Sequence, residues 1–188
     1  MIRRPMSGLV VMLAPALLTG ATTPSPPDVS GAILFSDASN CLYAPGTEAT
    51  FTAMLHFDAR HGTWLTRPRV TIGRLSLPTA RTVAPSEDVI RGGKDYQVSV
   101  HFPAGTLWNG LRLAEIRRHE GYYPETDSVE TRELVFLDSP ARVWNAFKRL
   151  GASVPEAPDY LEIGEDGIGS MSVYADKTRT VVNCNWGA

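Results

Sequence analysis

Residues 111–137 read LRLAEIRRHEGYYPETDSVETRELVFL, and this stretch predicts a long β-hairpin. The first strand is expected at 111–119, and 129–137 is typical of its antiparallel partner. Residues 120–128 are then the tip of the hairpin. The hairpin indicates an antiparallel sheet, because two strands joined by a short connection run in opposite directions.

Strand-like patterns continue on both sides of this hairpin. Residues 47–57 alternate between apolar and polar side chains, which is the two-residue period of a half-buried strand. Gly73 shifts the alternation of the following run and indicates a β-bulge. The connection at 78–94 has little periodicity, and connections of this length are often functional. We expect strands at 47–57, 64–77, 95–102, 160–163, 170–174 and 179–186.

One segment, residues 139–150, has the pattern of a helix. Ser139 is a favourable N-cap, Pro140 suits the first helical position, and Gly151 follows the last one. The side chains that share one face of this helix are apolar: Val143, Trp144, Phe147 and Leu150.

The order of strands, helix and strands predicts the fold class. We expect a β-rich α+β domain in which the one main helix packs on an antiparallel sheet. The alternative is a β-sandwich over residues 32–137, followed by a small βαβββ-like C-terminal part. The chain contains no internal repeat, and none of its motifs indicates a known family.

The N-terminus has the layout of a secretory signal peptide over residues 1–21. Arg3 and Arg4 precede an apolar run at 8–18, and about 11 apolar residues are too few to cross a bilayer. Residues 22–31 are rich in Pro, Thr and Ser and predict a flexible tether, so that 32–188 form a single globular domain. The expected location is periplasmic or secreted, without membrane insertion after signal cleavage.

The two cysteines, Cys41 and Cys184, are expected to form a disulfide. Export places the chain in an oxidising compartment, where such pairs close. The alternative is two free reactive thiols, but neither cysteine has a neighbouring histidine in the sequence to activate it.

The charge balance argues against a nucleic-acid partner. The chain carries 18 basic and 20 acidic residues, for a net charge of −2. Loss of Arg3 and Arg4 with the signal peptide changes this to −4. Binding to nucleic acid favours a basic excess or a basic stripe, and the sequence has neither.

Sequence motifs indicate no catalytic residue, no cofactor and no metal site. Glycine-rich nucleotide loops, the serine-hydrolase elbow and helical zinc motifs are all missing. A metal site from His56, Asp58 and His61 and a calcium site near Glu162, Glu165 and Asp166 are weaker alternatives than ordinary surface residues. Ser170 is expected to be a hairpin residue.

The hairpin offers the best candidate interaction surface. Arginine and tyrosine are enriched at the energetic centres of protein interfaces, and five such residues lie along it: Arg112, Arg117, Arg118, Tyr122 and Tyr123. The expected function is that of an exported, non-enzymatic binding module, an inhibitor or accessory subunit of another extracytoplasmic protein. Its loops at 86–94 and 122–127 would also be presented to that protein.

A second hypothesis comes from a different class. A small exported hydrolase or ligand-binding protein would assemble its site only in three dimensions, from residues such as His56, His101, His119 and Glu120. A deep pocket that holds two of these histidines and a carboxylate would favour this hypothesis.

Overall fold

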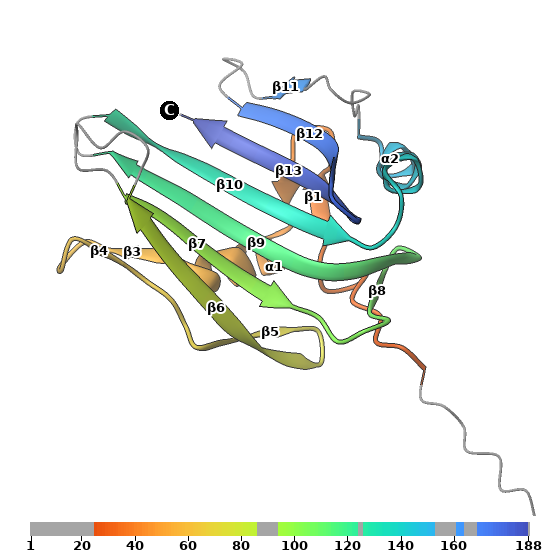
Figure 1. The fold of residues 1–188 in the computed structure, drawn as a ribbon, viewed down its shortest axis with the longest axis horizontal. Helices are drawn as coiled ribbons and strands as arrows, with labels where there is room; N and C mark the ends of the chain where they lie inside the picture. Colours follow the sequence, from red (N-terminus) through yellow and green to blue (C-terminus); the bar gives the residue numbers. More distant parts are fainter. Residues whose placement is uncertain (1–24, 86–93, 124–125, 153–160, 164–168, 188) are drawn as a thin grey trace, which may run out of the picture.

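A long antiparallel sheet forms the centre of the fold (Figure 1). The computed structural model describes residues 25–85, 94–123, 126–152, 161–163 and 169–187. The strands are, in their order across the sheet, β11 (Leu161–Ile163), β12 (Gly169–Asp176), β13 (Arg179–Gly187), β10 (Thr126–Phe136), β9 (Leu111–Tyr123), β7 (Lys94–His101), β6 (Leu75–Pro85) and β5 (Arg69–Ile72), with β8 (Leu107–Trp108) paired to β9. The predicted β-rich α+β class with antiparallel pairing is confirmed.

The hairpin predicted at 111–137 is present as β9 and β10. Arg132 pairs with Arg118 across the two strands, and Glu130 pairs with Glu120. Pairing continues to Tyr123 and Thr126, so most of the expected tip belongs to the strands. Charged side chains of both strands form ion pairs on the sheet, such as Arg118 with Glu120 and Arg132 with Glu130.

The segment predicted as a strand at 47–57 is a helix, α1 (Pro45–Met54), and this prediction is wrong. Its buried residues are Thr47, Phe51 and Met54. They have the i, i+4, i+7 spacing of one helix face, although the run that contains them also alternates between apolar and polar residues. Pro45 stands in the first turn of the helix, where its missing N–H has no hydrogen-bond partner to lose. A short strand, β3 (His56–Asp58), begins only after the helix.

The second helix, α2 (Pro140–Arg149), lies where the sequence predicts one. Gly151 has a φ of +89°, the left-handed conformation that ends many helices. The described residues therefore contain two helices instead of one main helix. The alternative with a separate C-terminal part is wrong, because β12 and β13 continue the main sheet beside β10.

The run predicted as one strand at 64–77 is divided among three. β4 (Thr63–Leu65) pairs with β3, whereas β5 and β6 form a hairpin in which Ile72 pairs with Leu75. Gly73 has a φ of +59° in the turn between them, so it marks a tight turn and the predicted bulge is wrong. β6 then continues to Pro85, into the connection expected at 78–94.

The apolar core lies on one face of the main sheet, which we call the covered face. Helix α1 and the strands β1 (Phe35–Asp37) and β2 (Leu42–Tyr43) lie behind the sheet in Figure 1, on this side. Trp108 is 1% exposed and contacts the rings of Phe35, Phe136 and Phe147. Its indole N–H donates a hydrogen bond of 2.8 Å to the carbonyl of Ile33.

The disulfide between Cys41 and Cys184 is confirmed. It joins the turn between β1 and β2 to β13, with a Cα–Cα distance of 6.0 Å and a sequence separation of 143. Both cysteines are fully buried. The bond therefore fixes the layer that contains β1 and β2 onto the sheet.

The contacts of the fold begin several residues before Ala32. The N–H of Val29 donates to the carbonyl of Leu107, and the N–H of Leu107 donates to the carbonyl of Pro27. Val29 is 2% exposed. The range 22–31, expected as a tether, thus includes residues that pack on β8, while the predicted signal peptide at 1–21 lies outside the described residues.

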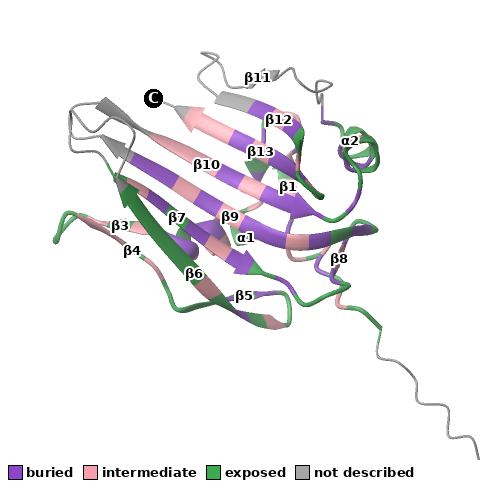
Figure 2. Ribbon diagram, in the orientation of Figure 1, coloured by how far each residue is buried: buried purple, intermediate pink, exposed green. Residues whose placement is uncertain are grey.

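The opposite face of the sheet, which we call the open face, carries no helix and no strand among the described residues (Figure 1). Figure 2 shows that burial changes from residue to residue along β7, β9 and β10, as expected of strands with two different faces. In β9, Ile116, Arg118 and Glu120 belong to the covered face, whereas Arg117 and His119 belong to the open face.

Candidate functional site

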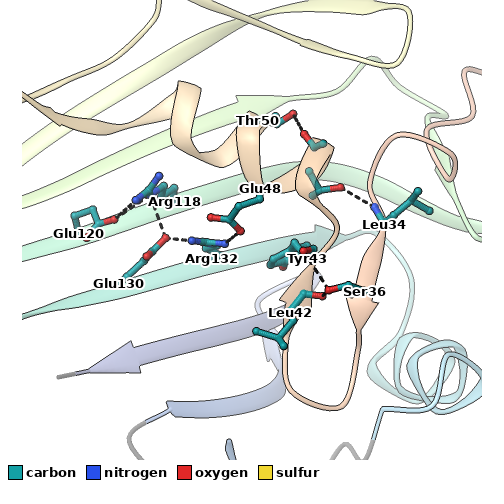
Figure 3. A network of polar contacts seen from close by, with 12 residues as sticks. Leu34, Ser36, Leu42, Tyr43, Glu48, Thr50, Arg118, Glu120, Glu130 and Arg132 are labelled. Atoms are coloured by element: carbon teal, nitrogen blue, oxygen red, sulfur yellow. Dashed lines mark hydrogen bonds and ion pairs between the residues drawn. The ribbon is translucent and has the colours of Figure 1, made fainter. Parts of the chain in front are cut away.

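Five charged side chains lie on the covered face between α1 and the sheet (Figure 3). We call them the buried charge cluster: Glu48 of α1, Arg118 and Glu120 of β9, and Glu130 and Arg132 of β10. The strand register places them together, because Arg118 pairs with Arg132 and Glu120 pairs with Glu130 across the hairpin. Cross-strand neighbours on one face are close enough to interact directly.

The cluster is a continuous chain of ion pairs. The Nε of Arg118 lies 2.9 Å from the Oε1 of Glu120 and 3.2 Å from the Oε1 of Glu130. Arg132 donates hydrogen bonds to Glu130 and to Glu48, so the chain crosses from the sheet to α1. Charge-assisted bonds of this kind are stronger than neutral ones.

Aromatic rings surround the guanidinium of Arg132. Its Cζ lies 5.1 Å from the ring centroid of Trp186, 5.5 Å from that of Phe51 and 5.9 Å from that of Tyr43. A guanidinium near ring faces gains cation–π attraction. Arg132 therefore connects α1, β2 and β13 at one point of the core.

The cluster holds three carboxylates against two guanidiniums, and one negative charge is therefore in excess. Glu120 is 2% exposed. Burial raises the pKa of Glu120 to about 7, although the charge of Arg118 opposes this rise and Glu130 adds to it. Within the cluster, the carboxylate of Glu120 can therefore take up a proton near neutral pH.

The raised pKa of Glu120 predicts a pH dependence of stability. In the unfolded chain Glu120 loses its proton near pH 4.5, whereas in the folded protein it keeps it up to about pH 7. The contribution of Glu120 therefore lowers the free energy of unfolding as the pH rises between these values. Glu120→Gln should remove this part of the slope in urea denaturation measured across the range.

A matched control for this measurement is Asp176→Asn, which removes an acidic group at the far end of β12 from the cluster. It should leave the slope between pH 4.5 and about pH 7 as in the wild type. If the free energy of unfolding changed with pH equally in Glu120→Gln and in the wild type, Glu120 would have the same pKa in the folded and unfolded states, contrary to the prediction.

A second set of polar side chains connects the strands of the open face. We call it the open-face network: Glu115 and Arg117 of β9, Glu133 of β10, Tyr174 of β12, and Arg179 and Asn183 of β13. The Nε of Arg117 lies 2.9 Å from the Oε1 of Glu115, and its Nη1 lies 3.1 Å from the Oε2 of Glu133. Hydrogen bonds to Glu115 raise the pKa of Arg117, which stays charged.

The network spreads sideways from β9 to β12. The Nη1 of Arg179 lies 2.9 Å from the Oε2 of Glu115. The hydroxyl of Tyr174 and the Nδ2 of Asn183 each lie 3.2 Å from the Oε1 of Glu133. Four adjacent strands thus present an ordered polar surface on this side of the sheet.

The three arginines of the predicted interaction surface do not come together. Arg117 lies on the open face, whereas Arg118 is 8% exposed on the covered face, because successive residues of a strand point to opposite sides. Arg112 lies at the other end of β9, where its Nη2 donates to the carbonyl of Leu137. The side chains of Tyr122 and Tyr123 lie outside the described part of the structure.

The residues of the hydrolase hypothesis are also spread over the molecule. His101 and His119 belong to the open face, with ring nitrogens 3.9 Å from Glu115 and 3.8 Å from Asp95, respectively. His56 begins β3, and Glu120 is buried on the covered face. No pair of these histidines shares a carboxylate within the residues that the structure describes.

The structure also places the other candidate ligands. The Nδ1 of His61 lies 2.6 Å from the Oδ2 of Asp58 in the turn after β3. Glu165 and Asp166 lie outside the described residues, as does the side chain of Glu162. Across the described ranges, no group of three or more His, Cys, Asp or Glu residues could hold a metal ion.

A shallow groove of about 730 Å³ runs along α1. It touches the buried charge cluster through Glu48, and its lining residues are Tyr43, Pro45, Glu48, Ala49, Thr52, Ala53, His56 and Arg67. Half of these side chains are small, and His56 is the one histidine among them. The groove thus holds the carboxylate of Glu48 but lacks the second histidine that the hydrolase hypothesis requires.

Sequence analysis missed the partners that complete both sets. Glu48 was placed on a strand, and Glu133, Tyr174 and Arg179 were not singled out. The hairpin register could have identified Glu133, because it pairs Glu133 with Arg117 and so places both side chains on the same face of the sheet. The positions of Tyr174 and Arg179 beside Glu133 and Glu115 can be recognised only once the pairing of β13 with β10 is known.

Comparison with protein families, with curated proteins and with solved structures gives no match for this chain. Within the described residues, neither helix is long and apolar enough to span a membrane. The fold and the two polar sets therefore provide the basis for any proposal about function.

Proposed function

We propose that this chain is an exported, non-enzymatic binding module that contacts another extracytoplasmic protein through its open face. The observation that carries the proposal is the uncovered polar surface of β7, β9, β10, β13 and β12, of which the open-face network holds the last four strands in one arrangement. A rigid surface loses little conformational entropy on binding. Such a module would act as an inhibitor or an accessory subunit.

Two further observations support export and binding over catalysis. The Cys41–Cys184 disulfide suits an oxidising compartment, as the signal peptide predicted at residues 1–21 requires. The described histidines are distributed over separate places, whereas general acid–base chemistry requires convergent groups.

The surface itself can be tested by site-specific photocrosslinking in the source organism. A photoreactive residue at Gln97 or Thr82, both exposed on the open face, should crosslink to a partner protein. The same residue at Thr52, exposed on α1 on the other side of the sheet, is the matched control and should give no such product. Crosslinking from Thr52 alone, or none from the open-face positions, would contradict the proposal.

A further inference from the structure

We infer that the chain forms a dimer in which β6 pairs antiparallel with β6 of a second copy, around a two-fold axis between the two Thr82 residues. The inference goes beyond the proposed function, because it concerns the edge of the sheet and not its open face. It follows from the backbone groups that β6 leaves unpaired along this edge, and from the order of the residues there.

The C-terminal part of β6 is an open edge of the main sheet. β5 pairs with β6 only from Leu75 to Pro78, whereas β7 pairs with the other side of β6 from Thr79 to Pro85. In Figure 1, β5 accordingly lies beside the lower end of β6 alone. Within the described ranges no further strand pairs with 79–85, since β3 and β4 form a sheet of their own. Unpaired edges of this kind can accept a strand from another chain.

The backbone groups of Arg81 and Val83 point out from this edge. The N–H of Thr79 donates to the carbonyl of Pro68 on the β5 side, at 3.1 Å. Backbone groups of successive residues alternate between the two sides of a strand, and β6 pairs with β7 over this range without a register shift. Arg81 and Val83 therefore have the direction of Thr79. Among the described residues, no hydrogen bond is formed with their backbone groups on that side.

The residues along the edge are complementary to themselves in one register. With Thr82 opposite Thr82 of the second copy, Arg81 faces Val83, and both residues have outward N–H and C=O groups. Each such pair can exchange two backbone hydrogen bonds, as hydrogen-bonded antiparallel pairs do. Ala80 then faces Ala84. No arginine stands opposite an arginine, so the register brings no like charges together.

The same register ends where further pairing is impossible. The next pair outward would be Thr79 with Pro85 of the second copy. The N–H of Thr79 already donates to Pro68, and proline has no N–H to donate. The paired segment is therefore 80–84 in both copies.

The side chains along 80–84 do not protect the edge from association. Charged side chains often do so in edge strands, but the guanidinium of Arg81 lies 5.4 Å from the ring centroid of Tyr96 in β7 and so extends over the sheet. Val83 is 47% exposed, and the added strand would cover it. At the other end of the sheet, β11 has three residues and offers a shorter template.

The proposed pairing joins two sheets into one. A two-fold axis between antiparallel edge strands is perpendicular to the sheet, so the open faces of both copies lie on the same side. Association closes at two copies, because each copy uses the same edge. An interface made by single strands is small, and we therefore expect a dimer that dissociates on dilution.

The first test is the mass in solution, measured by sedimentation velocity on the disulfide-bonded exported chain at concentrations up to about 1 mM. Wild-type protein should change from monomer to dimer as the concentration rises. Val83→Pro removes an N–H that is unpaired in the monomer, so it should weaken dimerisation by about tenfold or more while β6 stays folded. Val83→Thr keeps this N–H and a β-branched side chain. It is the matched control and should dimerise much as the wild type does.

The second test measures the register. The Cα atoms of a non-hydrogen-bonded antiparallel pair lie about 4.5 Å apart, within the range of a disulfide, and the two native cysteines are already bonded to each other. Thr82→Cys should therefore form a disulfide between two copies in mild oxidant. Ala80→Cys is the matched control, because it faces Ala84 of the second copy and should crosslink only in combination with Ala84→Cys.

Several results would overturn the inference. They are a monomer at all concentrations, oligomers larger than a dimer, equal dimerisation of Val83→Pro and Val83→Thr, and equal crosslinking by Thr82→Cys and Ala80→Cys. A monomeric wild type that accepts a strand of a different protein at β6 would also reject the second copy. Circular dichroism of each variant separates loss of pairing from loss of fold. Crosslinking of Gln97 to a different protein tests the open face separately, so either proposal can fail while the other stands.

Discussion

Replacement of Cys41 and Cys184 together by serine should lower the free energy of unfolding by up to roughly 5 kcal/mol. The disulfide closes a loop between residues 143 apart, and a crosslink of this length restricts the unfolded chain strongly. It also holds the turn between β1 and β2 against β13 in the folded protein. Urea denaturation of the double variant beside the wild type measures the difference.

Reduction of the wild type provides the control for this experiment. Wild-type protein treated with a thiol should approach the stability of the double serine variant, because both lose the same crosslink. If the double variant unfolded at the same urea concentration as the oxidised wild type, the disulfide would contribute nothing, contrary to the entropic argument.

The second large effect is expected at Arg132. Arg132→Met should lower the free energy of unfolding by about 3 kcal/mol, because it leaves Glu48 without its guanidinium partner and leaves Glu130 with Arg118 alone. The carboxylates are partly exposed, which sets the estimate at the lower end for a broken buried pair. Thermal and urea denaturation both measure it.

A compensated variant separates charge from packing at this place. Arg132→Met combined with Glu48→Gln and Glu130→Gln should recover much of the loss, because no unpaired charge then remains on these three residues. Arg149→Met, at an exposed position near the end of α2, is the matched control. An equal loss for Arg132→Met and Arg149→Met would contradict a structural role for the cluster.

The fold is predictable from sequence where local patterns have one interpretation. The hairpin at 111–137, the helix at 140–149 and the disulfide follow from alternation, capping and cysteine content. Residues 47–57 have two interpretations, because Thr47, Phe51 and Met54 lie at helical spacing within an alternating run. The helix is selected by its packing against β5 and β2, and this tertiary contact cannot be read from the local sequence pattern.

The candidate site is less predictable because it depends on the order of strands. Arg117 was chosen for its residue type, and the open face does include it. Its neighbours Glu133 and Arg179 lie on β10 and β13, which pair only after the chain has passed through α2 and β12. Arg118 was assigned to the same surface as Arg117, although the alternation of a strand separates them.

The alternation of β9, β10 and β13 divides sequence change in these strands into two independent kinds. In β10, in β13 and in β9 from Ile116 onward, odd-numbered positions such as 117, 133 and 179 belong to the open face, and even-numbered positions such as 118, 132 and 184 belong to the covered face. Under the proposed function, substitutions at exposed positions of the first kind would change the binding surface, while those of the second kind change packing in the core. The open face can thus change by substitution while the core stays the same.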